Sequence, residues 1–309
     1  MAVIGRYKFK GGKTMFKKII VFVMTLSMLA GVCSCAKAPR PQSQITDVVQ
    51  TEDNTYECQF EGLKFKFMLF LPEKTDANTP LILMLTGWGK NVGNFQFQTH
   101  MEETACPRGY AVCYVQPGQG RGQYGWDCGL GYPYEVDSLD YLVNLAIYLQ
   151  DEYGLSQTKA FAAGFSNGGY MIHRVAVEAS DTFLAVASVA GVMTTEVWNE
   201  RTDKTGIGVL EIYGTYDNKV PQNGNGTASD SPYPPIEEVM EYWASANGLG
   251  SSSVEALSDK AELTKYTALF NKTQVWSVKI EDGAHEWPEE DIAGFDTNSL
   301  ILDFFDQCS

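Results

Sequence analysis

One serine lies in residues 164–169, Gly-Phe-Ser-Asn-Gly-Gly, which contain the pattern Gly-x-Ser-x-Gly centred on Ser166. The small apolar residues 160–163 suit a buried parallel strand, and residues 170–179 carry apolar side chains at helical spacing. A strand, this serine and a helix are the context of a nucleophile elbow, a sharp turn that exposes the serine oxygen. The pattern predicts nucleophilic chemistry at Ser166. Because a glycine-rich turn with an idle surface serine has the same pattern, the prediction needs partner residues.

An activated serine needs a base within hydrogen-bond reach, and the base needs a third group to orient it. The chain has three histidines. After a nucleophile elbow the expected order along the chain is serine, acid, histidine. His100 precedes the serine, and His173 lies two turns down the same helix, where it is expected to be a packed or hydrogen-bonded residue beside the sheet. His285 remains as the predicted base.

Asp217 is the predicted acid. It follows an apolar strand-like run, 207–213, in the turn Gly-Thr-Tyr-Asp, which places a carboxylate at the carboxyl end of the sheet, where open α/β sheets bind ligands. An ordinary turn aspartate would look the same. Asp203 and Asp230 lie in polar segments without a preceding strand and rank below it.

Two backbone N–H groups are predicted to form an oxyanion hole. Asn167 follows the nucleophile, and Trp88 lies in the Thr-Gly-Trp-Gly segment that follows the apolar run 80–85.

The rest of the chain alternates strand-like and helix-like segments, which predicts one α/β domain with a mostly parallel, doubly wound sheet and helices on both faces. No internal repeat is visible. Residues 60–71 are expected to form an antiparallel pair of edge strands, with buried strands at 80–85, 110–115, 184–189, 207–213 and 273–280 and helices at 135–153, 236–246 and 299–305.

Residues 1–35 have the features of a signal peptide. Lys17 and Lys18 precede an apolar run, 19–32, that is too short for a comfortable membrane span, and Met15 is a candidate start. Small residues leading to Cys33 and Cys35 resemble a lipoprotein box, with cleavage by an ordinary signal peptidase as the alternative. The sequence predicts an exported protein, either secreted or held at the cell surface or in the periplasm. Residues 36–55 are expected to be a polar tether, and residues 56–309 the catalytic domain.

Charge and cysteine content exclude several classes. Residues 1–34 hold six of the 23 basic residues and none of the 38 acidic ones, so the remainder has 17 basic residues and a net charge of −21. A surface this acidic argues against nucleic acid and anionic membranes as partners, apart from an N-terminal lipid anchor. No metal or cofactor is expected, because the chain has few histidines and no zinc-type cysteine pair. The odd number of cysteines after residue 35 leaves at least one unpaired.

Four segments together resemble the polyhydroxybutyrate-depolymerase-like esterases, a group of the α/β-hydrolase fold that includes feruloyl and acetylxylan esterases (carbohydrate esterase family 1-like). They are residues 164–169, residues 214–221 with Val220-Pro221, Gly-Ala-His-Glu-Trp-Pro at 283–288, and Trp-Asp-Cys at 126–128. The resemblance runs from about residue 60 to residue 305. Thr86 stands where the group usually has a histidine, and cysteines common in the group after residue 247 are missing, so its disulfides are not expected here.

The resemblance implies an exported serine esterase with Ser166, Asp217 and His285 as nucleophile, acid and base. The expected substrates are feruloyl or acetyl esters on plant polysaccharide. Tyr124, Trp126, Tyr216 and Trp287 are candidate substrate contacts, since aromatic walls suit a phenolic group or a sugar; loop or core packing explains each of them equally well. The alternatives are a depolymerase of short-chain hydroxybutyrate-type polyester and a non-catalytic, glycan-binding surface protein of the same fold.

Overall fold

The computed structural model describes residues 40–309 except 121, 204–205, 225–232 and 270. The expected signal peptide, the cysteines at 33 and 35, and Asp230 lie outside the described residues. Residues Pro41–Ser309 form one compact unit. Among the residues described, no helix is both long enough and apolar enough to cross a membrane.

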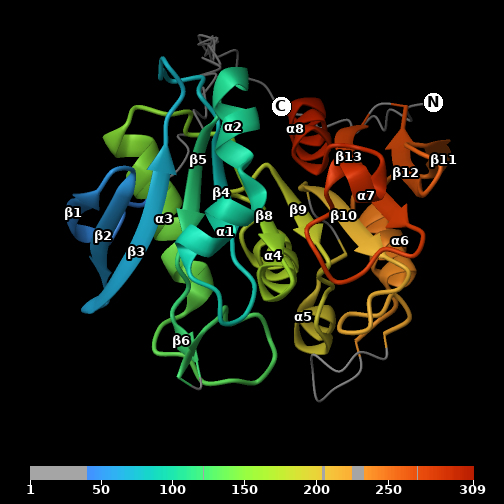
Figure 1. Ribbon diagram of the computed structural model, residues 1–309, viewed down its shortest axis with the longest axis horizontal. Coiled ribbons are helices and arrows are strands. Elements are labelled where there is room, and N and C mark those ends of the chain that lie inside the picture. The colour runs from blue at the N-terminus through green and yellow to red at the C-terminus, as the bar shows by residue number, and fades with distance from the viewer. Residues whose placement is uncertain (1–39, 121, 204–205, 225–232, 270) are drawn as a thin grey trace, which may run out of the picture. The chain divides into compact units, whose positions relative to one another are not determined.

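A mixed sheet of eleven strands organises this unit, in the order β1-β2-β3-β5-β4-β8-β9-β10-β13-β12-β11. Its six central strands, from β5 to β13, pair in parallel, and the strands on either flank pair antiparallel. Figure 1 shows the order as a colour change, from blue β1–β3 at one edge to orange and red β11–β13 at the other. The strands are β1 (Thr46–Glu52), β2 (Thr55–Phe60), β3 (Leu63–Phe70), β4 (Leu81–Leu85), β5 (Ala111–Val115), β8 (Ala160–Phe165), β9 (Ala185–Val189), β10 (Gly208–Gly214), β11 (Ser251–Ala256), β12 (Ala261–Ala268) and β13 (Asn271–Ile280), with β6 (Gln119–Gly120) and β7 (Gln123–Tyr124) as a separate pair.

Helices cover both faces of the sheet. Side chains of the buried strand β4 alternate between two apolar layers, with Leu83 in one and Met84 in the other. Helices α3, α4 and α6 pack into the first layer, and α1, α2 and α8 into the second. The helices are α1 (Val92–Thr99), α2 (Met101–Ala105), α3 (Ser138–Glu152), α4 (Asn167–Glu178), α5 (Thr195–Glu200), α6 (Ile236–Ala246), α7 (Glu290–Ala293) and α8 (Thr297–Gln307), with a 3-10 turn at Cys106–Arg108.

This architecture confirms the predicted fold class, and it corrects the expected edge. Residues 46–52, expected within the tether, form β1, whose side chains are mostly exposed. Pairing with β2 satisfies the main-chain groups on one side of β1, and those on the outer side can bind water, so this edge strand needs no apolar pattern. An antiparallel pair of edge strands was expected within residues 60–71, but this stretch forms the single strand β3, which lies third from the edge and pairs with β2 at 55–60. Strands β11 and β12 at the other edge were not expected, because β11 is polar and exposed.

The five cysteines of the described residues, Cys58, Cys106, Cys113, Cys128 and Cys308, are all free. Burial raises the pKa of Cys58 and of Cys106 to about 11, so both are held as neutral thiols at neutral pH.

A buried polar cluster ties α4 to β10 beneath the site. His173 of α4 and Glu211 of β10 are both about fully buried, and His173 Nε2 lies 2.9 Å from Glu211 Oε2. Trp243 Nε1 donates to His173 Nδ1 at 3.2 Å, so that nitrogen is the acceptor and the imidazole is neutral, with its proton on Nε2. Burial lowers the pKa of His173 to about 3 and raises the pKa of Glu211 well above its usual value. The pair is therefore a neutral hydrogen bond, and His173 is a core residue, as expected.

This protonation state predicts how Glu211→Gln behaves. The amide oxygen still accepts from His173, so near pH 4 the variant should unfold with about the same free energy as the wild type. Folded wild type must keep the Glu211 proton that the unfolded chain releases above about pH 4.3, so its stability should fall with rising pH by up to about 1.4 kcal/mol per unit relative to the variant. Protonation of His173 affects the stability of both proteins alike, so it cancels from the difference between wild type and Glu211→Gln.

Denaturant unfolding of both proteins from pH 4 to 8 measures the effect. Glu211→Leu is the matched control: it leaves the His173 N–H without an acceptor and should cost about 1–3 kcal/mol near pH 4, where Glu211→Gln costs little. A difference between wild type and Glu211→Gln that does not change with pH would contradict a protonated Glu211.

Candidate active site

Ser166 sits in a strained turn between β8 and α4. Its backbone has φ 53° and ψ −114°, a conformation that costs a non-glycine residue about 1–3 kcal/mol. The turn is closely packed: a Cβ on Gly164 would meet the Gly168 carbonyl oxygen at 2.4 Å, and one on Gly168 would meet the Leu85 oxygen at 2.2 Å. Only glycine fits at either position. The Ser166 N–H donates to the Val189 carbonyl at 2.9 Å, which anchors the turn to β9.

The structure brings Ser166, His285 and Asp217 together across 119 positions of sequence. His285 Nε2 lies 2.9 Å from Ser166 Oγ, and His285 Nδ1 lies 2.7 Å from Asp217 Oδ2. His285 lies in the loop between β13 and α7, and Asp217 in the turn after β10. A serine hydroxyl that donates to one imidazole nitrogen while the other donates to a carboxylate is the arrangement that activates a serine nucleophile.

Asp217 is held as an anion. Burial favours the protonated acid, but the hydrogen bond from His285 and the N–H groups of Val220 and Lys219 outweigh it, and the pKa of Asp217 is lowered. The two N–H groups donate to Oδ1 at 2.9 and 2.8 Å, leaving Oδ2 for the imidazole. This carboxylate can fix the imidazole tautomer and stabilise an imidazolium.

The N–H groups of Trp88 and Asn167, the two predicted oxyanion donors, have no acceptor within the described residues. Asn167 is the first residue of α4, whose N-terminal N–H groups have no partner in the helix. Trp88 lies in the loop after β4. This loop is fixed by Trp126, whose Nε1 donates to the Thr86 carbonyl at 2.9 Å. The Asn167 side chain accepts from the Trp126 N–H at 2.8 Å, so one contact network joins both predicted donors.

A cavity of about 630 Å³ opens beside Ser166 and His285. Its wall is mixed, with apolar and aromatic side chains and several polar ones. The lining residues are Gly87, Trp88, Lys90, Gln98, Leu130, Tyr132, Phe165, Ser166, Asn167, Tyr170, Lys219, His285 and Glu286.

The four aromatic residues expected to contact substrate do not line this cavity. Trp126 has no exposed surface, and Trp287 is buried, with Nε1 3.3 Å from Asn298 Oδ1 and its ring edge-on to Phe95. Both support loops, which corrects the prediction. Tyr124 lines a different cavity, and Tyr216 is 74% exposed outside both.

Other residues take the places expected for these aromatics. Trp88 and Tyr132 meet edge to face in the cavity wall, with ring centroids 5.6 Å apart. Lys90 lies two positions after Trp88, and Lys219 two positions after Asp217. Their closeness in sequence to predicted site residues could have indicated that both line the cavity. Tyr132 lies in an irregular loop, and nothing in its sequence context indicates the cavity.

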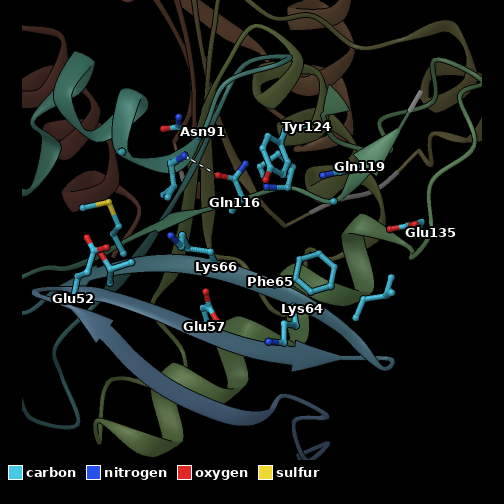
Figure 2. A pocket seen from close by; sticks show the side chains of 17 residues that line it. Glu52, Glu57, Lys64, Phe65, Lys66, Asn91, Gln116, Gln119, Tyr124 and Glu135 are labelled. Atoms are coloured by element: carbon cyan, nitrogen blue, oxygen red, sulfur yellow. Dashed lines mark hydrogen bonds between the residues drawn. The ribbon is translucent and has the colours of Figure 1, made fainter. Parts of the chain in front are cut away.

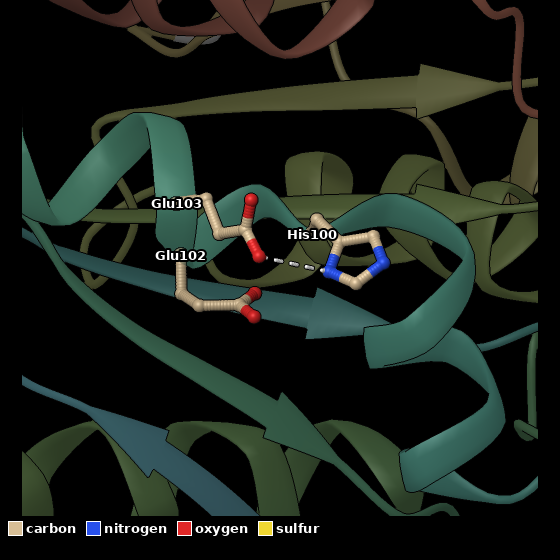
Figure 3. A group of neighbouring side chains, drawn as sticks. All are labelled: His100, Glu102 and Glu103. Carbon is tan, nitrogen blue, oxygen red and sulfur yellow. Dashed lines mark ion pairs between the residues drawn. The ribbon is translucent and has the colours of Figure 1, made fainter.

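One cluster in the described part of the chain has the composition of metal ligands: His100, Glu102 and Glu103, with one ligand atom from each within 4.8 Å of the others. Figure 3 shows His100 turned toward Glu103, whose Oε1 lies 3.3 Å from Nδ1. Glu102 is turned to other partners, accepting from Tyr114 Oη at 2.6 Å and from Gln96. With its buried carboxylate used in this way, the cluster is better explained as packing between α1, α2 and β5.

The sheet order and the strand–serine–helix turn are those of the α/β-hydrolase fold, which the chain shares with solved structures of that fold. Residues 95–246 match the family model described as the prolyl oligopeptidase family (Peptidase_S9). The predicted resemblance to esterases of this fold is confirmed by the relatives named below.

NocK of Nocardia uniformis subsp. tsuyamanensis, assigned by name to the esterases, is 30% identical over 234 residues, 68% of this chain and 65% of NocK. Feruloyl esterase B of Thermothelomyces thermophilus is 25% identical over 170 residues, 54% of this chain and 53% of that protein. The chain thus spans less than two thirds of either curated relative. The acetyl xylan esterase from Aspergillus awamori shares the fold, with a TM-score of 0.59 at 13% identity over 84% of this chain and 98% of the other.

The support of the Trp88 loop by Trp126 is testable through the reactivity of Ser166. Trp126→Phe removes the N–H that binds the buried Thr86 carbonyl, which should cost about 1–3 kcal/mol of stability. Because the loop then loses its fixed position, labelling of Ser166 by a fluorophosphonate should slow about tenfold.

Trp276→Phe is the matched control, since it removes an indole hydrogen bond, from Nε1 to Gln274 Oε1 at 3.2 Å, of a buried tryptophan in β13 that does not line the catalytic cavity. We expect it to lower the melting temperature without slowing labelling. Equal labelling rates in the two variants, measured well below their melting temperatures, would rule out a positioning role for Trp126.

Proposed function

We propose that this chain is an exported serine esterase that hydrolyses carboxylic esters, with feruloyl or acetyl esters on plant polysaccharide as its substrates. The observation that carries the proposal is the continuous hydrogen-bonded series from Ser166 Oγ through His285 to Asp217 at the wall of a 630 Å³ cavity. Two unpaired N–H groups beside the serine complete the requirements for acyl transfer.

The chemistry follows from this geometry. Ser166 Oγ attacks the ester carbonyl as His285 Nε2 takes its proton, and the N–H groups of Trp88 and Asn167 stabilise the oxyanion. The imidazolium, paired with the Asp217 carboxylate, then gives the proton to the leaving alcohol. Water attacks the acyl-enzyme by the same proton transfers in reverse and frees the acid.

The choice of ester rests on the relatives and on the cavity. Relatives that bear the names feruloyl and acetyl xylan esterase support an ester carried by a polysaccharide. The edge-to-face rings of Trp88 and Tyr132 suit a phenolic acyl group, and Gln98 and the charged residues suit sugar hydroxyls. A short-chain polyester would be a less suitable occupant of this mixed wall. A non-catalytic glycan-binding role does not explain why Ser166, His285 and Asp217 are joined by hydrogen bonds.

Export is the second part of the proposal. It rests on the basic and apolar N-terminal segment of the sequence, with a lipid anchor at Cys33 or Cys35 as one form and simple secretion as the other.

Hydrolysis of a substrate panel tests the activity. Methyl ferulate, acetylated xylan, p-nitrophenyl acetate and butyrate, and hydroxybutyrate oligomers are compared for wild type and Ser166→Ala. We expect turnover of the feruloyl or acetyl substrates and a loss of at least about 10⁴-fold in kcat for the variant. Absence of turnover on every ester, with no fluorophosphonate labelling of Ser166, would favour the binding protein instead.

The acid is tested separately by Asp217→Asn. The amide holds the imidazole in the wrong tautomer, so kcat on p-nitrophenyl acetate should fall about 10³–10⁴-fold with little change in KM. Asp203→Asn, an exposed loop substitution, is the control and should retain wild-type kcat. If Asp217→Asn kept wild-type kcat, another carboxylate would have to orient His285.

A further inference from the structure

A second cavity, of about 670 Å³, lies between the β2–β3 hairpin and the start of α1. In Figure 2 Asn91, Gln116 and Tyr124 line one side of it, and Glu57, Lys64 and Lys66 rise from the strands on the other. We call it the hairpin groove. We propose that it binds the neutral polysaccharide chain that carries the scissile ester, an inference that rests on the esterase function proposed above.

The wall of the hairpin groove has the chemistry of a sugar site. Sugar hydroxyls donate and accept hydrogen bonds, and the groove offers both kinds of partner in amide, carboxylate and ammonium groups. The ring of Tyr124 is 37% exposed and gives a flat apolar surface for the face of a sugar ring.

Charge argues for a neutral ligand. The acids Glu52, Glu57 and Glu135 are offset in all but one charge by Lys64 and Lys66, and Glu57 lies directly opposite Lys66 in the β2–β3 register. A strongly charged ligand of either sign would meet a group of like charge on the wall. An aliphatic ligand would leave these polar groups without hydrogen-bond partners.

The groove and the catalytic cavity share one wall, residues 87–93. Gly87, Trp88 and Lys90 face the catalytic cavity, and Asn91, Val92 and Gly93 face the groove. Gln116 fixes this segment with both ends of its amide, accepting from the Val92 N–H at 2.9 Å and donating to the Lys90 carbonyl at 3.3 Å. The Gly89 N–H donates to the Tyr124 carbonyl at 2.8 Å.

This shared wall gives the groove a function. A sugar chain lying along Tyr124 and Asn91 passes directly beside the loop that bears the Trp88 N–H. Sugar units on one side of the ester can therefore occupy the groove while the ester itself reaches Ser166. Binding energy from these units would add to the binding of a polymeric substrate and be absent for a small ester.

Direct binding is measured on Ser166→Ala by calorimetry with unsubstituted xylohexaose, cellohexaose and mannohexaose. At least one should bind, and adding Tyr124→Ala should weaken it about tenfold. Tyr216→Ala is the matched control, because it removes a more exposed tyrosine outside both cavities and should leave affinity unchanged. Absence of binding by all three, or equal loss in both tyrosine variants, would overturn the proposal.

Kinetics with active enzyme separate the groove from the chemistry. Tyr124→Ala removes the ring but keeps the main-chain carbonyl that accepts from the Gly89 N–H. It should therefore raise KM for acetylated xylan several-fold at unchanged kcat and leave kcat/KM for p-nitrophenyl acetate as in wild type. An enzyme that turns over p-nitrophenyl acetate but binds no hexasaccharide is an esterase without this groove function. Hexasaccharide binding without turnover of any ester would instead remove the esterase and keep the sugar site.

Discussion

The structure depends on one local constraint, the left-handed backbone of Ser166. Strand β8 must turn at once into α4, and that turn fits only because Gly164 and Gly168 allow the main chains of β4, β8 and α4 to meet. The energy stored in the turn is offset by the surrounding parallel strands, which are buried on both faces. In return the serine oxygen stands clear of the sheet at the end of a helix whose first N–H groups are unpaired.

The helix that carries the serine must also keep its distance from the strand that leads to the acid. The neutral hydrogen bond between His173 and Glu211 links these two elements deep in the core, with Trp243 of α6 as a third member. Close packing already holds α4 against the sheet. The two hydrogen bonds of His173 add directional links from α4 to β10, the strand that leads to Asp217, and to α6.

Sequence was sufficient where the chemistry follows strand ends, and insufficient where it follows loops. The sequence allowed us to infer strands β8 and β10, the turns that follow them and the chain order of Ser166, Asp217 and His285. This was possible because parallel strands bring their carboxyl ends to one edge of the sheet. The directions of Trp126 and Trp287 could not, because each is set by one distant hydrogen bond, to Thr86 and to Asn298. The exposed edge strands β1 and β11 were missed for a related reason: pairing, not burial, makes them strands.

The loop after β4 keeps its position although Thr86 replaces the histidine that the resembled esterases usually have. Thr86 occupies the place of a more usual histidine, and its side chain reaches no farther than the neighbouring Gly87 carbonyl. The loop is held through its main chain instead: Trp126 binds the Thr86 carbonyl, Tyr124 binds the Gly89 N–H, and Gln116 binds the main chain at both 90 and 92. Of these three supports, Gln116 and Tyr124 also line the hairpin groove, whereas Trp126 does not. A sugar chain bound in the groove as proposed would therefore touch residues that also hold the loop bearing the Trp88 N–H.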